Sequence, residues 1–161
     1  KMSLEDNMMI CSKKGWKGLR ISLTGKMREY FRSQLKILDM GLENRLNDNV
    51  NQFSGGQRQA LTLLMAVMSK PDLLLLDEHT AALDPKTAEL VMELTDKIVK
   101  EKQLTTIMVT HNLRYAVEYG NRLVMMHNGH MILDKKGKEK EDMAIDDILT
   151  LFNEISIECG N

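Results

Sequence analysis

The sequence predicts an α/β fold built on a small parallel sheet, and two observations support that prediction. The runs Leu73–Leu76 and Thr105–Thr110 are apolar without alternation, which is typical of strands covered on both faces. Between them, Pro85–Lys102 repeats apolar residues with a helical period. Strand, helix and strand therefore form one crossover unit, and the two strands are expected to lie parallel.

The residues before the first strand predict two helices and a loop. Apolar side chains recur at helical spacing over Lys26–Met40, and Gly41 stands where a helix C-cap is expected. Residues 42–52 are polar and rich in asparagine, so a loop is expected there. From Ser54 to Ser69 the chain is apolar beyond its first turn, which indicates a buried helix.

The C-terminal part predicts a helix, a hairpin, a linker and a last helix. A helix is expected over Asn112–Glu118, and Asn128-Gly129 between apolar segments is the signature of a tight β-hairpin. Lys135–Asp142 is expected to be a charged linker, and an amphipathic helix follows from Ile145. We expect three parts: a helical subdomain (1–70), an α/β core (71–135), and a linker with the C-terminal helix (136–161).

The composition is that of a soluble globular chain of 161 residues, 43% hydrophobic and 28% charged, with a net charge of −1. The apolar run Leu73–Leu76 stops at Asp77, well short of the ~18 to 20 residues that span a bilayer. Cys11 and Cys159 have neither metal nor disulfide spacing, which favours a reducing compartment. The balanced charge argues against a dedicated nucleic-acid binder.

Positive charge is concentrated in residues 13–28, which hold no acidic residue and a single tryptophan, Trp16. Two interpretations stay open. The segment is either a solvated loop or a surface that touches a partner or an anionic ligand. Its basic residues are Lys13, Lys14, Lys17, Arg20, Lys26 and Arg28.

Ser54-Gly55-Gly56-Gln57 has the character of a phosphate-binding helix start. A serine hydroxyl can cap the helix, and two glycines let an anion approach backbone N–H groups at the positive end of the helix dipole. The same four residues would also be found at the start of an ordinary capped helix that binds no ligand. Ligand binding by these residues is therefore a hypothesis that needs further support.

That support comes from the ends of the two predicted strands, where open parallel sheets bind ligands. Asp77 and Glu78 follow the first strand, and alternation gives their side chains different tasks. We expect Asp77 to hold Mg²⁺ and Glu78 to act as the general base on an attacking water. His111, after the second strand, is either a donor to a γ-phosphate oxygen or a capping histidine.

Four motifs in order resemble those of ATP-binding cassette (ABC) ATPases. They are similar to the signature sequence (Phe53–Gln59), Walker B (Leu73–Glu78), the D-loop (Ala82–Pro85) and the switch histidine (Val109–Asn112). The resemblance implies a P-loop NTPase fold with a helical subdomain, a parallel-sheet core and a C-terminal hairpin and helix. It also implies that Ser54, Gly55, Gly56, Gln57 and Asp84 contact ATP, with Glu78 and His111 catalytic and Asp77 on Mg²⁺.

The resemblance further implies the biology. Two such subunits would meet head to tail around ATP, dock on the transmembrane permease domains of a transporter, and lie in the cytoplasm on the inner face of the plasma membrane. Small-solute uptake, with a solute-binding protein as a further partner and no direct nucleic acid, fits best. The alternatives are a soluble ABC ATPase acting on nucleic acid or the ribosome, and a non-catalytic fragment that contributes a signature.

The sequence departs from the family pattern in three places near the site. His79 replaces the usual proline, Ala81 replaces a small hydroxyl residue, and Asn112 replaces a common acid. No Gly-x-x-x-x-Gly-Lys-Ser/Thr phosphate loop occurs, so we expect a C-terminal fragment or split product of a longer subunit. Such a fragment should keep an unpaired sheet edge and an uncovered apolar surface.

Overall fold

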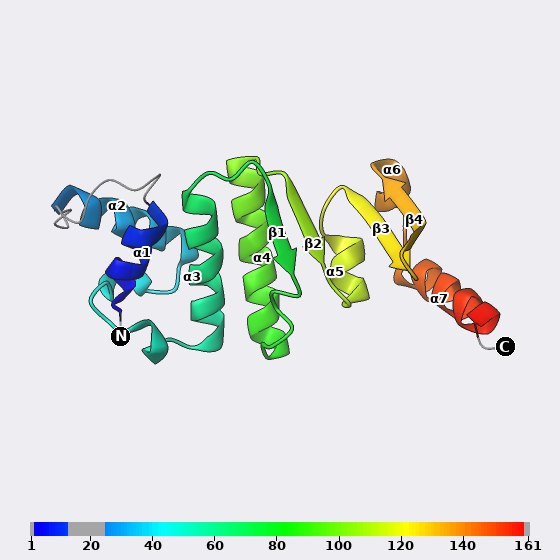
Figure 1. Cartoon of the computed structure of the whole chain (residues 1–161), viewed down its shortest axis with the longest axis horizontal. Helices are drawn as coiled ribbons and strands as arrows, with labels where there is room; N and C mark the ends of the chain where they lie inside the picture. Colours follow the sequence, from blue (N-terminus) through cyan, green and yellow to red (C-terminus); the bar gives the residue numbers. More distant parts are fainter. Residues whose placement is uncertain (1, 13–24, 160–161) are drawn as a thin grey trace. The chain divides into compact units, whose positions relative to one another are not determined.

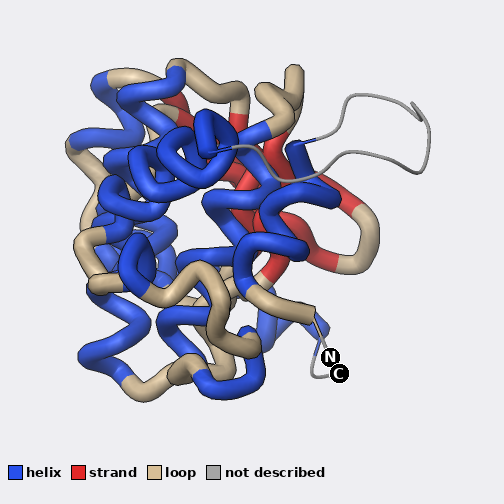
Figure 2. Tube along the Cα trace, turned by 90° about the vertical axis from the view of Figure 1, so that its left-hand side faces the viewer, coloured by secondary structure: helices blue, strands red, loops and turns tan. Residues whose placement is uncertain are grey.

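A computed structural model of the chain describes residues 2–12 and 25–159. Helices make up most of the described residues (Figure 2). The chain divides into two compact units, residues 1–108 and 109–161. Most of the basic segment, including Trp16, lies outside the described residues.

The first unit contains the helices and the parallel strand pair (Figure 1). Its elements in chain order are α1 (Leu4–Ser12), α2 (Gly25–Leu35), three 3₁₀ turns (Lys36–Leu38, Leu42–Asn44 and Val50–Gln52), α3 (Gly55–Met68), β1 (Leu74–Asp77), α4 (Pro85–Lys102) and β2 (Thr106–Val109). The predicted helix over Ser54–Ser69 and the helix between the two strands are confirmed, and so is the crossover unit.

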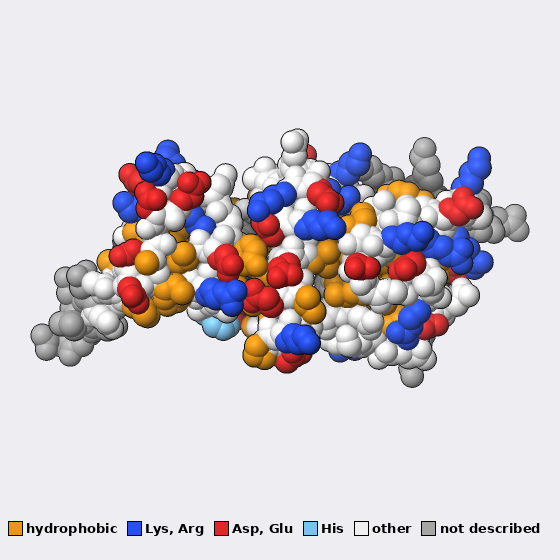
Figure 3. All heavy atoms as spheres, turned by 180° about the vertical axis from the view of Figure 1, so that it is seen from behind, with side chains coloured by type: hydrophobic (Ala, Val, Ile, Leu, Met, Phe, Trp, Pro, Cys, Tyr) orange, Lys and Arg blue, Asp and Glu red, His pale blue; other side chains and the backbone are white. Residues whose placement is uncertain are grey.

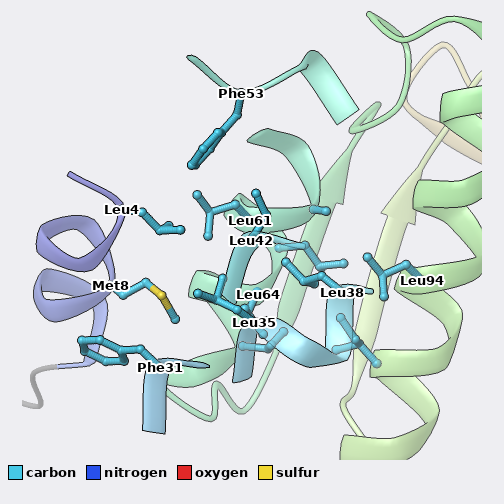
Figure 4. Close-up of a cluster of buried hydrophobic side chains, with 14 of the residues drawn as sticks. Leu4, Met8, Phe31, Leu35, Leu38, Leu42, Phe53, Leu61, Leu64 and Leu94 are labelled. Carbon is cyan, nitrogen blue, oxygen red and sulfur yellow. The ribbon is translucent and has the colours of Figure 1, made fainter. Parts of the chain in front are cut away.

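A single apolar cluster holds this unit together (Figure 4). Helix α3 supplies its centre, because Leu64 is fully buried and Leu61 nearly so. Helices α1 and α2 and the 3₁₀ turns close it from one direction, and β1 and α4 from another. The side chains labelled in the close-up are Leu4, Met8, Phe31, Leu35, Leu38, Leu42, Phe53, Leu61, Leu64 and Leu94.

The sheet of the first unit has two strands, β1 and β2, which run parallel. Their starts are tied by a hydrogen bond from the Leu74 N–H to the Thr105 carbonyl, 2.9 Å long. Leu74 and Leu76 face the core, but Leu75 is 66% exposed and Ile107 is 54% exposed. Within the described residues the prediction of two covered faces is therefore wrong, while the expected uncovered apolar surface is present.

The predicted helix over Lys26–Met40 is also too long. Helix α2 ends at Leu35 and tightens into a 3₁₀ turn that stops at Asp39, whose φ of 51° is left-handed. Gly41, with φ 70°, begins the next 3₁₀ turn instead of closing the helix. The predicted loop over 42–52 contains two such turns, and the second is capped by Asn49, whose side chain accepts from the Asn51 N–H.

Two basic residues of the segment 13–28, Lys26 and Arg28, lie within the described part of the chain. Arg28, on α2, donates two hydrogen bonds of 2.8 Å to the carboxylate of Glu5 on α1. The guanidinium is thus used inside the unit to join two helices. Lys26 is exposed on the first turn of α2.

The second unit contains α5 (Leu113–Glu118), β3 (Arg122–His127), β4 (His130–Lys136), α6 (Lys138–Glu141) and α7 (Ile145–Cys159). Strands β3 and β4 pair antiparallel with His127 opposite His130, so the predicted Asn128-Gly129 hairpin is confirmed. Both turn residues have positive φ, 47° and 78°, as the tight primed turn requires. The pairing shifts between Met125 and Met126, where a bulge interrupts the ladder.

The predicted charged linker over Lys135–Asp142 is wrong. It forms the end of β4 and the short helix α6, and Lys140 within it is buried. The Lys140 ammonium donates to the Val117 carbonyl in the last turn of α5, a favourable place for a cation. Burial lowers the pKa of Lys140. No helix within the described residues is both long and apolar enough to cross a bilayer.

Removing part of the central cluster should weaken the first unit strongly. We expect Leu64→Ala to lower the free energy of unfolding by about 2–5 kcal/mol, because the fully buried side chain leaves a cavity between helices. Leu90→Ala, at a position on α4 that is 51% exposed, should change it by less than about 0.5 kcal/mol. Urea unfolding followed by circular dichroism measures both, and equal losses would contradict the packing described here.

Candidate functional site at the N-termini of α3 and α4

The first group of predicted site residues forms the start of α3. The Ser54 hydroxyl oxygen accepts from the Gln57 N–H at 3.2 Å, and Gln57 Oε1 accepts from the Ser54 N–H at 3.1 Å. This is a reciprocal capping box. Because Ser54 Oγ is the acceptor in this bond, its hydroxyl hydrogen is not consumed by it.

At each of the two glycines a side chain would meet a residue of α4 or of the loop before it. A Cβ on Gly56 would lie 2.3 Å from Thr87 Cγ2 on α4, and one on Gly55 would lie 3.3 Å from Leu83 Cδ2. Real Cβ atoms essentially never approach another atom to 2.3 Å, so the packing of α3 on α4 is by itself a sufficient reason for glycine at position 56. The N–H groups of both glycines belong to the first turn of α3, where backbone donors have no partner within the helix.

Asp84 begins α4 beside this point. Its carboxylate accepts from the Thr87 N–H at 3.1 Å, and Pro85 occupies the first helical turn. Hydrogen bonds from the Thr87 side chain and backbone lower the pKa of Asp84 below its ordinary value of 3.8. Thr87 therefore serves two elements, because its N–H donates to Asp84 while its methyl group lies against Gly56.

The predicted metal ligand and base lie at the carboxyl end of β1, as expected. Asp77 is the last strand residue and Glu78 follows with φ 42°, a left-handed conformation that costs a residue with a side chain roughly 1–3 kcal/mol. Both side chains are exposed. Within the described part of the chain no three His, Cys, Asp or Glu side chains gather as a metal site. Mg²⁺ is compatible with this surrounding, because it is commonly held by one or two carboxylates together with water and substrate phosphates.

Sequence reasoning noted His79 only as a departure from a pattern, but the structure gives it a partner. Its Nε2 lies 3.2 Å from the hydroxyl oxygen of Thr95 on α4, and Thr95 is 4% exposed. Burial lowers the pKa of His79 below its ordinary value of 6.5. The two residues are sixteen positions apart, and no local pattern announces the contact.

His111 belongs to the second unit. It is exposed and precedes Asn112, the N-cap residue of α5. The side-chain oxygen of Asn112 accepts from the Tyr115 N–H at 3.3 Å, so His111 is not the N-cap of α5. The structure thus brings Ser54–Gln57 and Asp84 together within the first unit, to which His111 does not belong.

One face of the molecule carries charge of both signs. Lys, Arg, Asp and Glu side chains are interspersed on the face drawn in Figure 3, with hydrophobic side chains between them. This agrees with the net charge of −1.

Comparison with known proteins identifies the family. The profile described as "ABC transporter" matches residues 2–81. A tyrosine transport ATP-binding protein of Clostridioides difficile is 54% identical over 118 residues, which are 73% of this chain and 47% of that protein. A methionine import ATP-binding protein of Listeria monocytogenes is 39% identical over 93 residues, 58% of this chain and 28% of that protein. The chain thus spans about half the length of the first relative, and less of the other.

Solved structures agree on the fold. An ATP-binding cassette of an ABC transporter in its ADP conformation matches with a TM-score of 0.74 at 24% identity, covering 99% of this chain and 63% of that one. A dimeric bacterial ABC transporter cassette matches with a TM-score of 0.62 at 29% identity, covering 84% and 56%. The chain belongs to the ABC transporter family and has the fold of its nucleotide-binding cassettes.

The contact between α3 and α4 can be tested by filling it. We expect Gly56→Ala to lower the free energy of unfolding by about 1–3 kcal/mol, because the new Cβ collides with the Thr87 methyl group. Adding Thr87→Ser removes that methyl but keeps the hydroxyl, and should recover most of the loss. Gly55→Ala is the matched control, since it meets only the end of a flexible leucine. Urea unfolding of the four proteins decides, and an equal cost at both glycines would count against the close approach.

The Asp84 cap should be pH-dependent. Its carboxyl pKa is lower when folded than when unfolded, so its stabilising effect is complete above 3.8 and is lost as pH falls through the lowered folded value. We therefore expect Asp84→Ala to destabilise the chain at pH 7 and the difference from wild type to narrow at pH 3. Urea unfolding at both pH values measures this, with Asp72→Ala as an exposed control. A constant difference would show that the charge plays no part in the cap.

Proposed function

We propose that this chain is the signature-bearing part of the ATPase subunit of an ABC transporter, and that the whole protein hydrolyses ATP to drive transport. The observation that carries the proposal is the capped α3 N-terminus, whose glycine N–H groups lie beside the N-terminus of α4. Two helix N-termini side by side are a favourable place for phosphate. Family membership supports the same conclusion.

The described residues divide the work by chemistry. We assign the Ser54 hydroxyl and the Gly55 and Gly56 N–H groups to the γ-phosphate oxygens of ATP, because each is a donor at the positive end of a helix. Gln57 holds Ser54 in place from its side-chain oxygen and keeps an amide NH₂ for the nucleotide. Asp84 orients α4 and the loop before it at the same boundary.

The remaining assignments concern the reaction itself. Asp77 would hold Mg²⁺, which supplies charge neutralisation on the phosphates when bound. Glu78 takes a proton from the attacking water, and His111 donates to a γ-phosphate oxygen. In phosphoryl transfer, positioning and electrostatic stabilisation supply nearly all the rate acceleration. The protein must therefore hold the base in one orientation.

We further propose the partners. Two subunits meet head to tail, so that the Ser54 signature of one completes the nucleotide site of the other, and a related bacterial cassette is described as dimeric. The helical part, residues 1–70, presents the signature and docks on transmembrane permease domains at the cytoplasmic face of the membrane. A solute-binding protein would deliver the cargo. Relatives named for tyrosine transport and methionine import support uptake of an amino acid.

Glu78 gives the sharpest test of this function. In the complete ATPase we expect Glu78→Gln to keep ATP binding and to lower hydrolysis by roughly 10²-fold or more, the loss typical of a missing general base. Glu93→Gln, the same change at an exposed position of α4, is the control. Phosphate release and equilibrium nucleotide binding measure the two effects. If hydrolysis survives in Glu78→Gln, the base is elsewhere and His111 is the next candidate.

A further inference from the structure

The residue after the proposed base is fastened to the body of the first unit. His79 is half-buried, and its Nε2 lies 3.2 Å from Thr95 Oγ1, in the middle of α4. The Thr95 hydroxyl itself donates to the Val91 carbonyl at 2.7 Å. Because a hydroxyl has one hydrogen, Thr95 can only accept from His79, and the histidine must carry its proton on Nε2.

Two backbone hydrogen bonds of the loop that holds Glu78 are local. The Ala81 N–H donates to the Glu78 carbonyl at 2.9 Å, and the Leu83 N–H donates to the Thr80 carbonyl at 3.1 Å. These bonds shape the turn, but neither fixes it against the sheet or α4. The bond between His79 and Thr95 does, because it joins the loop to a helix whose inner face is buried in the first unit.

The backbone conformation at Glu78 gives such an anchor a task. A residue with a side chain keeps a φ of 42° only where the structure around it over-determines the conformation. If the turn relaxed, the Glu78 carboxylate would point elsewhere. A base must lie within hydrogen-bond reach of the proton that it removes, so its direction matters as much as its presence.

We propose that His79 is a positioning residue for Glu78. His79 donates its Nε2–H to Thr95 and so holds the left-handed turn at Glu78 against α4. This inference rests on the proposed function, in which Glu78 is the base.

The test removes the bond from either end and then restores it. His79→Leu deletes the donor and Thr95→Val deletes the acceptor at nearly constant shape, whereas His79→Gln keeps an N–H donor and Thr95→Ser keeps the hydroxyl. In the complete ATPase we expect each deleting variant to lower kcat roughly 10- to 100-fold with KM for ATP changed less than about twofold. The two restoring variants should regain most of the loss, and the double deletion should cost no more than one alone. His130→Gln on the hairpin is the matched control.

A second measurement does not depend on hydrolysis. Nitrogen-15 NMR of the 161-residue chain should show His79 as the Nε2–H tautomer, with a slowly exchanging ring proton that Thr95→Val makes fast. An Nδ1–H tautomer, unchanged kcat in His79→Leu, or independent losses in the double variant would overturn the proposal. Full activity in Glu78→Gln would instead overturn the proposed function.

The conservative variants keep the test decisive if a deleting variant does not fold. His79→Gln and Thr95→Ser each retain the hydrogen-bonding group that the anchor needs, so both should keep a kcat close to that of the wild type. A folded His79→Gln or Thr95→Ser protein with a kcat as low as that expected for the deleting variants would overturn the anchor.

Discussion

The site depends on the close approach of α3 and α4 at their N-termini. Gly56 and the Thr87 methyl group leave no room for a Cβ between them, so the two helix starts are brought within van der Waals contact. Each start is capped by its own short polar residue, Ser54 or Asp84, which leaves both helices well defined up to their first turn. Two positive helix ends are thereby held at one place, and neither would attract an anion as strongly alone.

The orientation of α3 at this approach depends on the core of the first unit, which is centred on that helix. Leu61 and Leu64 pack toward α1 and α2 and, through the same cluster, toward β1 and α4. A helix buried on several faces cannot rotate or slide without emptying part of the core. The orientation of the glycine N–H groups is therefore a consequence of apolar packing several turns away.

Sequence patterns predicted the local features well and the tertiary ones poorly. The cap at Ser54, the Asp84-Pro85 helix start and the Asn128-Gly129 turn are decided by neighbouring residues, so their signals are contained in a few letters. The covering of β1 is not local. The apolar run around Leu75 predicts a buried position, but the described chain leaves Leu75 exposed.

Other differences between prediction and structure have the same origin, since they depend on residues distant in the sequence. Helix α2 ends at Leu35, and the 3₁₀ turn that follows it stops at a left-handed Asp39 and not at Gly41. Lys140 is buried because a carbonyl at the end of α5 receives it, which a run of charged residues does not reveal. Thr87 was within reach of sequence reasoning, as the third helical residue after an Asp-Pro start, whereas the His79–Thr95 contact was not.

Because the backbone at Glu78 is left-handed, selection for stability and selection for activity favour different residues at this position. Glycine or asparagine would adopt the same φ with less strain, so either would relieve the fold at this position. Both would also remove the carboxylate on which the proposed chemistry rests. A library of this chain sorted only for heat resistance would therefore enrich inactive sequences here, and thermostabilised versions need this codon held constant.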